Sequence, residues 1–176
     1  MTRRKSPAGF LLLAAVAVLL IWPVYQWAVL PASGQEKEES TYLLYQVSRL
    51  QMELLAQGVK EAANEHTAEA LESLKVRLYS ASFTHNKLAE ASGSRLSELR
   101  SLQRLSEWIT RVQLGERELS EEEAAVLQEM AEHFEPVNAS YENLFGEVSG
   151  LIPSQIGKLG DADDKLADWL EEELEL

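Results

Sequence analysis

Apolar residues recur at intervals of three and four along most of this chain, which is the spacing that places side chains on one face of an α-helix. The pattern predicts four main helices and a short acidic terminal helix, over about 41–66, 67–89, 95–114, 120–151 and 161–176. Short turns between helices favour antiparallel neighbours. The sequence therefore predicts an all-α fold, built as an antiparallel helical bundle of about four to five helices.

The fourth predicted helix has the most regular apolar stripe, which alternates steps of three and four from Leu127 to Leu151. Ser120 and Glu123 precede it as a capping box, in which each side chain satisfies a backbone amide at the helix start. Pro136 lies inside the stripe and removes one helical hydrogen bond, so we predict a kink or two abutting helices there.

The first predicted helix combines two runs of apolar residues into one stripe, Leu43, Val47, Leu50, Leu54 and then Leu55, Val59, Ala62. The alternative architecture is a set of long antiparallel coiled-coil hairpins, which need a partner helix to cover their apolar stripes. Before the terminal helix, residues 149–160 are rich in helix breakers and predict a connection, with Asp161 as the helix cap.

The most apolar part of the chain lies at its start. Between Phe10 and Leu30, 21 residues carry no ionisable side chain except the phenol of Tyr25. As a helix, this run is roughly 32 Å long, close to the hydrocarbon thickness of a bilayer. Three basic residues at 3–5 precede it, and the bias of such residues toward the cytoplasm keeps the N-terminus inside.

Several residues of this run support an anchor that stays in the membrane. Trp22, Tyr25 and Trp27 gather at its outer end, where aromatic rings favour the headgroup level, and Pro23 kinks the last turns. The alternative is a cleaved signal peptide, for which Ala-Ser-Gly at 32–34 fits the cleavage site. Because such peptides have a shorter apolar region of about 7–15 residues, the length favours an uncleaved anchor.

The predicted organisation therefore has four parts, which are a cytoplasmic tail, a transmembrane helix, a polar linker and an extracytoplasmic bundle, over 1–9, 10–30, 31–40 and 41–176. This places the chain in the cell membrane as a single-pass protein, with the lipid bilayer as its first partner.

Charge and composition exclude several function classes. The net charge of the chain is −13, and the part after Leu30 has 13 Lys and Arg against 29 Asp and Glu, a formal charge of −16. Such a surface repels phosphate backbones, so a nucleic-acid partner is not expected. The chain has no cysteine, which excludes disulfides, thiol catalysis and a lipoprotein anchor.

The histidines are the main candidates for chemistry. His85 falls on the second helix's stripe and is predicted to face inward, either as a pH-sensitive switch or as an ordinary hydrogen-bonded core residue. His133 follows Glu129 by four residues, whereas carboxylate-bridged metal sites in bundles use a spacing of three and a second copy of the motif. We find no catalytic or nucleotide-binding motif, and therefore predict neither an enzyme nor a cofactor.

The chain resembles the N-terminal, membrane-anchored helical region of the YpeB-type spore germination proteins. The resemblance rests on the basic start and single span, on "YLLYQVSRLQMELLAQGV" and on "LSEEEAAVLQEM", and covers about residues 1–150. It implies an outward-facing domain that stabilises, and is stabilised by, a cortex-lytic enzyme in a Gram-positive envelope. The family's C-terminal repeat domains have no counterpart in this sequence, and the resemblance supplies no site residue.

The favoured function is protein–protein interaction or assembly at the bacterial cell envelope, with a protein partner or a second copy bound through a helix face. The side chains proposed to bind that partner are Tyr141, Leu144, Phe145, Trp169 and Leu170. The alternative is that these residues complete the core. Two other hypotheses stay open: a four-helix sensor domain that binds a small ligand and signals through a partner, and a metal-binding bundle.

Overall fold

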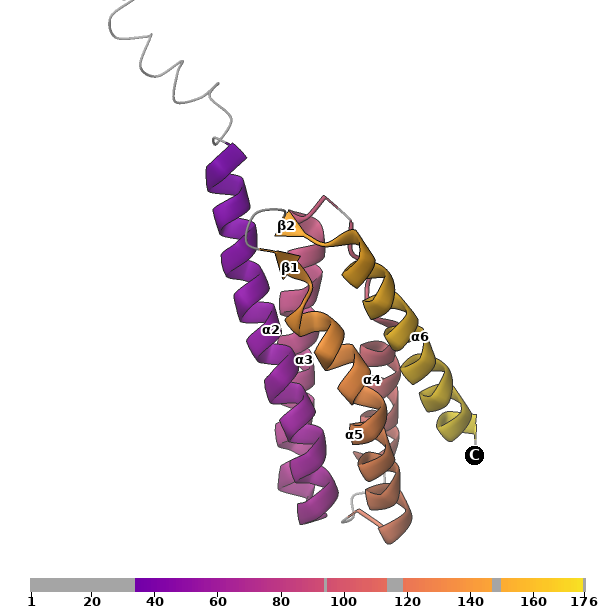
Figure 1. Cartoon of the computed structure of the whole chain (residues 1–176). Helices are drawn as coiled ribbons and strands as arrows, with labels where there is room; N and C mark the ends of the chain where they lie inside the picture. The colour runs from indigo at the N-terminus through magenta and orange to yellow at the C-terminus, as the bar shows by residue number, and fades with distance from the viewer. Residues whose placement is uncertain (1–33, 94, 114–118, 147–149, 176) are drawn as a thin grey trace, which may run out of the picture. The chain divides into compact units, whose positions relative to one another are not determined.

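The computed structural model describes residues 34–93, 95–113, 119–146 and 150–175, and it is helical apart from one very short hairpin. Its helices are α2 Gly34–Glu65, α3 Ala68–Ala91, α4 Arg100–Gln113, α5 Glu121–Glu142 and α6 Pro153–Glu175. Consecutive helices run in opposite directions (Figure 1). The prediction of an all-α bundle is therefore confirmed for this part of the chain.

The bundle comprises the residues from Ser40 onward, because the chain divides into two compact units between Glu39 and Ser40. Within it α6 packs against both α4 and α5, and α3 packs against α4. The largest fully buried side chains come from all five helices, among them Met52, Leu74, Leu105, Phe134 and Leu159. One continuous apolar core thus holds the described helices together.

Local capping signals in the sequence fix two helix starts. Ser120 and Glu123 form the predicted capping box: the Ser120 amide donates to Glu123 Oε2 at 2.8 Å, and the Glu123 amide donates to Ser120 Oγ at 3.2 Å. Thr67 caps α3 by accepting from the Ala70 amide at 3.1 Å. His66, just before it, has a φ of 55°, which turns the chain sharply between α2 and α3.

Several predicted boundaries are wrong. α2 already begins at Gly34, inside the expected linker 31–40, and α4 begins at Arg100 rather than near 95. The fourth predicted helix ends at Glu142 instead of continuing to Leu151. Helical periodicity alone does not show where a helix stops, because an apolar stripe can continue through a turn into the next element.

After α5 the chain forms a small antiparallel hairpin of β1, Phe145–Gly146, and β2, Gly150–Leu151. The helix that follows begins at Pro153, so Asp161 lies inside α6 and is not its cap. Proline suits a first helical position because the amide it lacks has no partner there. The segment predicted to be a breaker-rich connection is therefore mostly helix.

α5 continues through Pro136 as one helix, so the predicted pair of abutting helices is absent from it. The proline is exposed, and water can bond the carbonyl that it leaves without a helical partner. In addition, the Ser140 hydroxyl donates to the Pro136 carbonyl at 2.8 Å.

No helix among the described residues is both long enough and apolar enough to cross a bilayer. The predicted anchor lies outside these residues, together with its candidate side chains Phe10, Trp22, Pro23, Tyr25, Trp27 and Leu30.

Candidate functional site

The five side chains predicted to bind a partner lie in the core or against it. Tyr141, Leu144 and Leu170 are fully buried, while Phe145 and Trp169 are partly buried and pack on the core. Tyr141 lies against Tyr45 of α2 and His85 of α3, and α6, which carries Trp169 and Leu170, packs against α5 and α4. All five residues therefore contribute to the core of the bundle, and the three buried ones are covered by the rest of the chain.

Aromatic contacts occupy the two partly buried members of this group. The Phe145 ring lies 5.2 Å from the Tyr45 ring and 5.3 Å from the Tyr42 ring, between centroids. The Trp169 ring stacks on the His133 imidazole at 4.8 Å. Both side chains thus join neighbouring elements of the bundle.

His85 is fully buried and has a hydrogen bond at each ring nitrogen. Nε2 lies 2.7 Å from the Ser97 carbonyl, and Nδ1 lies 2.9 Å from the Tyr141 hydroxyl. A carbonyl oxygen can only accept, so Nε2 carries the proton, and Nδ1 accepts from the phenol. These bonds join α3, the segment before α4 and α5 around a neutral imidazole.

Burial lowers the pKa of His85, and the hydrogen bond to Ser97 and the charges of Asp163 and Glu98 oppose this shift only in part. Burial likewise raises the pKa of Tyr141, which therefore keeps its hydroxyl proton. The pair is thus a neutral polar contact inside the core. A proton added to Nδ1 would convert an acceptor into a donor facing the phenol.

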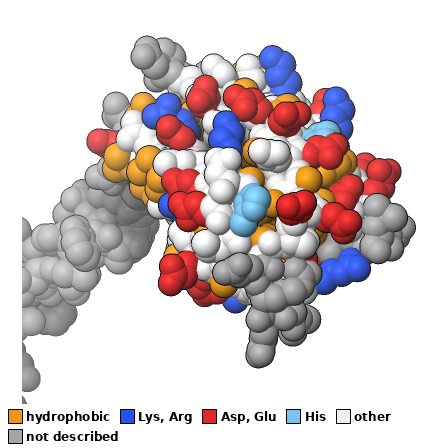
Figure 2. All heavy atoms as spheres, turned by 90° about the horizontal axis from the view of Figure 1, so that it is seen from below, with side chains coloured by type: hydrophobic (Ala, Val, Ile, Leu, Met, Phe, Trp, Pro, Cys, Tyr) orange, Lys and Arg blue, Asp and Glu red, His pale blue; other side chains and the backbone are white. Residues whose placement is uncertain are grey.

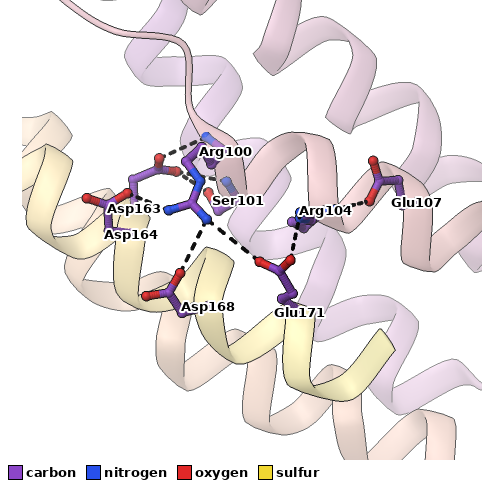
Figure 3. A network of polar contacts seen from close by, with 8 residues as sticks. All are labelled: Arg100, Ser101, Arg104, Glu107, Asp163, Asp164, Asp168 and Glu171. Atoms are coloured by element: carbon purple, nitrogen blue, oxygen red, sulfur yellow. Dashed lines mark hydrogen bonds and ion pairs between the residues drawn. The ribbon is translucent and has the colours of Figure 1, made fainter. Parts of the chain in front are cut away.

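A second polar network joins α4 to α6 (Figure 3). The Asp163 carboxylate is buried and accepts from the Arg100 amide at 2.8 Å, from the Ser101 amide at 3.0 Å and from the Ser101 hydroxyl. These amides are among the first of α4, which have no partner inside the helix. Asp163 therefore caps α4 from another helix.

Basic side chains of α4 extend this network toward solvent. Arg100 lies 3.0 Å from Asp164 and 3.3 Å from Asp168, and Arg104 lies 3.0 Å from Glu171 (Figure 3). These ion pairs are largely exposed, so each adds little stability by itself. Together they place two basic residues of α4 beside the acidic residues of α6.

The described residues contain no cluster of three or more His, Cys, Asp or Glu that could hold a metal ion. Figure 2 shows acidic side chains spread over the end of the molecule that it views, with fewer basic ones among them. His133 lies 3.9 Å from Glu129, which makes an exposed pair on α5.

The most distinctive surface of the described residues is apolar and lies on α2 and α3. Every exposed large hydrophobic side chain in the part of the chain that the structure describes belongs to one of these two helices. Their exposed fractions run from 39% for Tyr42 to 72% for Tyr79. We call this set the α2/α3 face, and it consists of Tyr42, Leu43, Val47, Leu50, Val76, Tyr79 and Phe83.

Contacts between the two helices place Leu50 of α2 at about the height of Tyr79 and Phe83 of α3. The Ser48 hydroxyl donates to the Thr84 carbonyl at 2.9 Å, and the Arg77 guanidinium donates to the Leu54 carbonyl at 3.3 Å. Leu50 lies between these contacts on α2, and the exposed residues near 79–83 lie between them on α3. The exposed side chains near the middle of the two helices therefore lie at the same level, while Tyr42, at one end of α2, also contacts Phe145 and Tyr45.

A signal in the sequence marks this surface. α2 carries two apolar stripes of helical spacing, one through Leu43, Val47 and Leu50 and another through Tyr45, Met52, Leu55, Val59 and Ala62. An offset of two residues turns one stripe to nearly the opposite side of the helix from the other. Because one core can bury only one of them, the merged stripe predicted from the sequence is wrong in its first half.

A groove of about 590 Å³ lies between α3 and α4, beside this face. Its lining includes the buried leucines 78, 99 and 102, the exposed Val76 and Tyr79, and polar side chains such as Asn86. The volume is within the range of small-molecule sites, about 300–1,000 Å³.

Comparison of the chain with models of known families, with curated proteins and with solved structures finds no match.

Proposed function

We propose that this chain is a single-pass, membrane-anchored protein without enzymatic activity, whose extracytoplasmic helical bundle binds another protein through the α2/α3 face. In this proposal it acts in an assembly at the bacterial cell envelope. The resemblance to YpeB-type proteins favours a sporulation-related assembly.

The observation that carries the proposal is the exposed apolar surface of the hairpin. Full burial of one Val, Leu or Phe side chain is worth about 1.5–3 kcal/mol, so leaving several in water forgoes a large stabilisation. The same bundle buries its other large apolar side chains well. Apolar residues gathered on one surface mark interaction sites more often than singly scattered ones do.

The anchor is supported by the sequence alone. The run from Phe10 to Leu30 matches the length of a spanning helix, and the basic residues before it favour an N-terminus inside the cell. The strongly acidic remainder suits a soluble domain displayed beyond the membrane.

A protease-accessibility test in intact cells examines the anchor and its orientation. We expect protease added outside to digest the bundle, and the chain to remain in the membrane fraction after carbonate washing. Protection of the bundle in intact cells, or a mature chain that begins near residue 35, would contradict the proposal.

Site-specific photocrosslinking examines the binding surface. A photoreactive amino acid at Phe83, which is exposed on the α2/α3 face, should give a defined crosslinked product in cells. The matched control is the same amino acid at Glu132, an exposed position on α5. Equal yields at both positions, or no product from Phe83, would remove the face as the binding surface.

The α3/α4 groove favours one second candidate, a sensor domain that binds a small apolar molecule. Under this alternative, mass spectrometry of the purified protein detects a co-purified compound. The compound should be lost in Ser82→Trp, which fills the groove from its partly buried lining. A groove that is empty in the wild-type protein would argue against a sensor.

A further inference from the structure

We propose that the partner seated on the α2/α3 face is a second copy of this chain, packed in parallel with its α2 beside α2 of the first copy. The contact would run along Leu43, Val47, Leu50 and Leu54. This inference rests on the proposed membrane anchor, which sets the relative direction of the two copies.

The identity of the stripe residues fits a two-stranded coiled coil, and the proposed anchor makes it parallel. Their steps of four, three and four are the coiled-coil repeat, with Leu43 and Leu50 at d positions and Val47 and Leu54 at a positions. In a parallel coiled coil, a β-branched residue at a with leucine at d favours two strands, and Val47 with Leu50 has this pattern, whereas the second a residue is Leu54. Leu43, Val47 and Leu50 are each about half exposed, so a facing helix can reach them.

The flanking residues remove the main obstacle to self-association, which is the acidic charge of the chain. The positions that border the stripe beside Val47 and Leu50 are Gln46 and Gln51, both uncharged. In a parallel pair these amides face each other across the seam, at the g and e positions that otherwise hold charged residues. Two copies can therefore approach along α2 without bringing like charges together at its centre.

The position of the stripe along the chain supplies the direction. The apolar run ends at Leu30, and the stripe begins at Leu43, in the first helix after that run. Two copies anchored in the same membrane thus present their stripes in the same direction and at the same distance from the anchor. A seam of only a few turns is weak between free molecules, but tethering raises the effective concentration of the second copy.

Cysteine crosslinking of the full chain in native membranes tests this arrangement, because the chain has no cysteine of its own. Single variants Val47→Cys and Leu50→Cys should form disulfide-linked dimers on mild oxidation, since facing a and d residues of a parallel pair lie close together. Arg49→Cys is the matched control: it is exposed on the same helix but points away from the stripe.

The outcomes separate this inference from the proposed function. Dimers from Val47→Cys and Leu50→Cys with little product from Arg49→Cys support a parallel second copy. Equal yields from all three variants indicate random collision and overturn it. If Leu50 instead crosslinks to a protein of a different mass, the second copy is excluded while a protein-binding role stands. Protection of the bundle from external protease overturns the proposed function independently.

A second measurement uses the detergent-solubilised full chain. The wild-type protein mass should be twice 19.7 kDa after subtraction of detergent, and Val47→Glu with Leu50→Glu should return it to one chain. Two buried apolar contacts replaced by charges weaken association on the order of a hundredfold or more. Arg49→Glu should remain dimeric, and helix content should be unchanged because these side chains lie outside the core. A wild-type chain that is monomeric both in detergent and in membranes overturns the inference.

Discussion

Asp163 of α6 accepts the Ser101 amide of α4 at 3.0 Å, across 62 positions of sequence. With the Arg100 amide at 2.8 Å on its other oxygen, the carboxylate supplies the cap that α4 lacks in its own sequence. The start of α4 is therefore defined by the docking of α6. This relationship links helix formation to tertiary packing.

Replacement of Asp163 by alanine should destabilise the bundle by about 2 kcal/mol, since it removes a helix cap and leaves buried amides without an acceptor. Asp164→Ala is the matched control, because Asp164 is exposed and its loss removes only a surface ion pair. Chemical unfolding of the full chain in detergent, monitored by circular dichroism, gives the unfolding free energies of both variants. Equal losses in the two variants would show that Asp163 does not act as a cap.

The unfolding free energy should fall as the pH drops below about 6.5, the ordinary pKa of histidine in an unfolded chain. Burial lowers the pKa of His85 in the folded state, so the unfolded state binds its proton first. This contribution is fully present above about pH 6.5, is lost as the pH falls toward the folded-state pKa, and levels off below it. Unfolding measured between about pH 8 and 5 shows the trend.

His85→Gln isolates this effect, since both proteins keep the two other histidines of the chain. The unfolding free energy of the variant should be lower than that of the wild type at neutral pH, but it should change less with pH over the same interval. Parallel curves for the two proteins would assign the pH dependence to other groups.

Tyr141→Phe should cost about 1–2 kcal/mol, because it leaves the buried Nδ1 of His85 without its donor. Tyr79→Phe is the matched control. It removes the phenol hydroxyl of the most exposed side chain of the α2/α3 face and should change stability little. Thermal unfolding of the two variants side by side checks this difference. A neutral Tyr141→Phe would show that the phenol does not matter to the core.

Two glycine substitutions should change the stability of the bundle in opposite directions. Gly157→Ala should stabilise α6 by about 0.5–1 kcal/mol, since the position is helical and a Cβ there meets nothing within 4 Å. Gly93→Ala should destabilise by about 1 kcal/mol, because Gly93 follows α3 with a φ of 73°. Denaturant midpoints of both variants against wild type give the signs. A stabilising Gly93→Ala would contradict the left-handed conformation at the end of α3.

The sequence by itself determined the features that depend on neighbours along the chain. The spacing of apolar residues predicted helices and their antiparallel order, and Ser120 with Glu123 marked a helix start, because capping joins residues only three apart. The sequence also predicts that His85 faces inward, since it lies on the same helical stripe as Ala81 and Leu88, and in the structure all three are buried.

Only the tertiary structure decided which of two similar stripes on α2 enters the core. The spacing is the same for both, and the choice depends on which face the other helices cover. Asp163 as a cap and Tyr141 as the donor to His85 join residues more than fifty positions apart, so no local pattern records them. Burial of Tyr141, Leu144 and Leu170 follows for the same reason: periodicity identifies an apolar face, but packing determines what covers it.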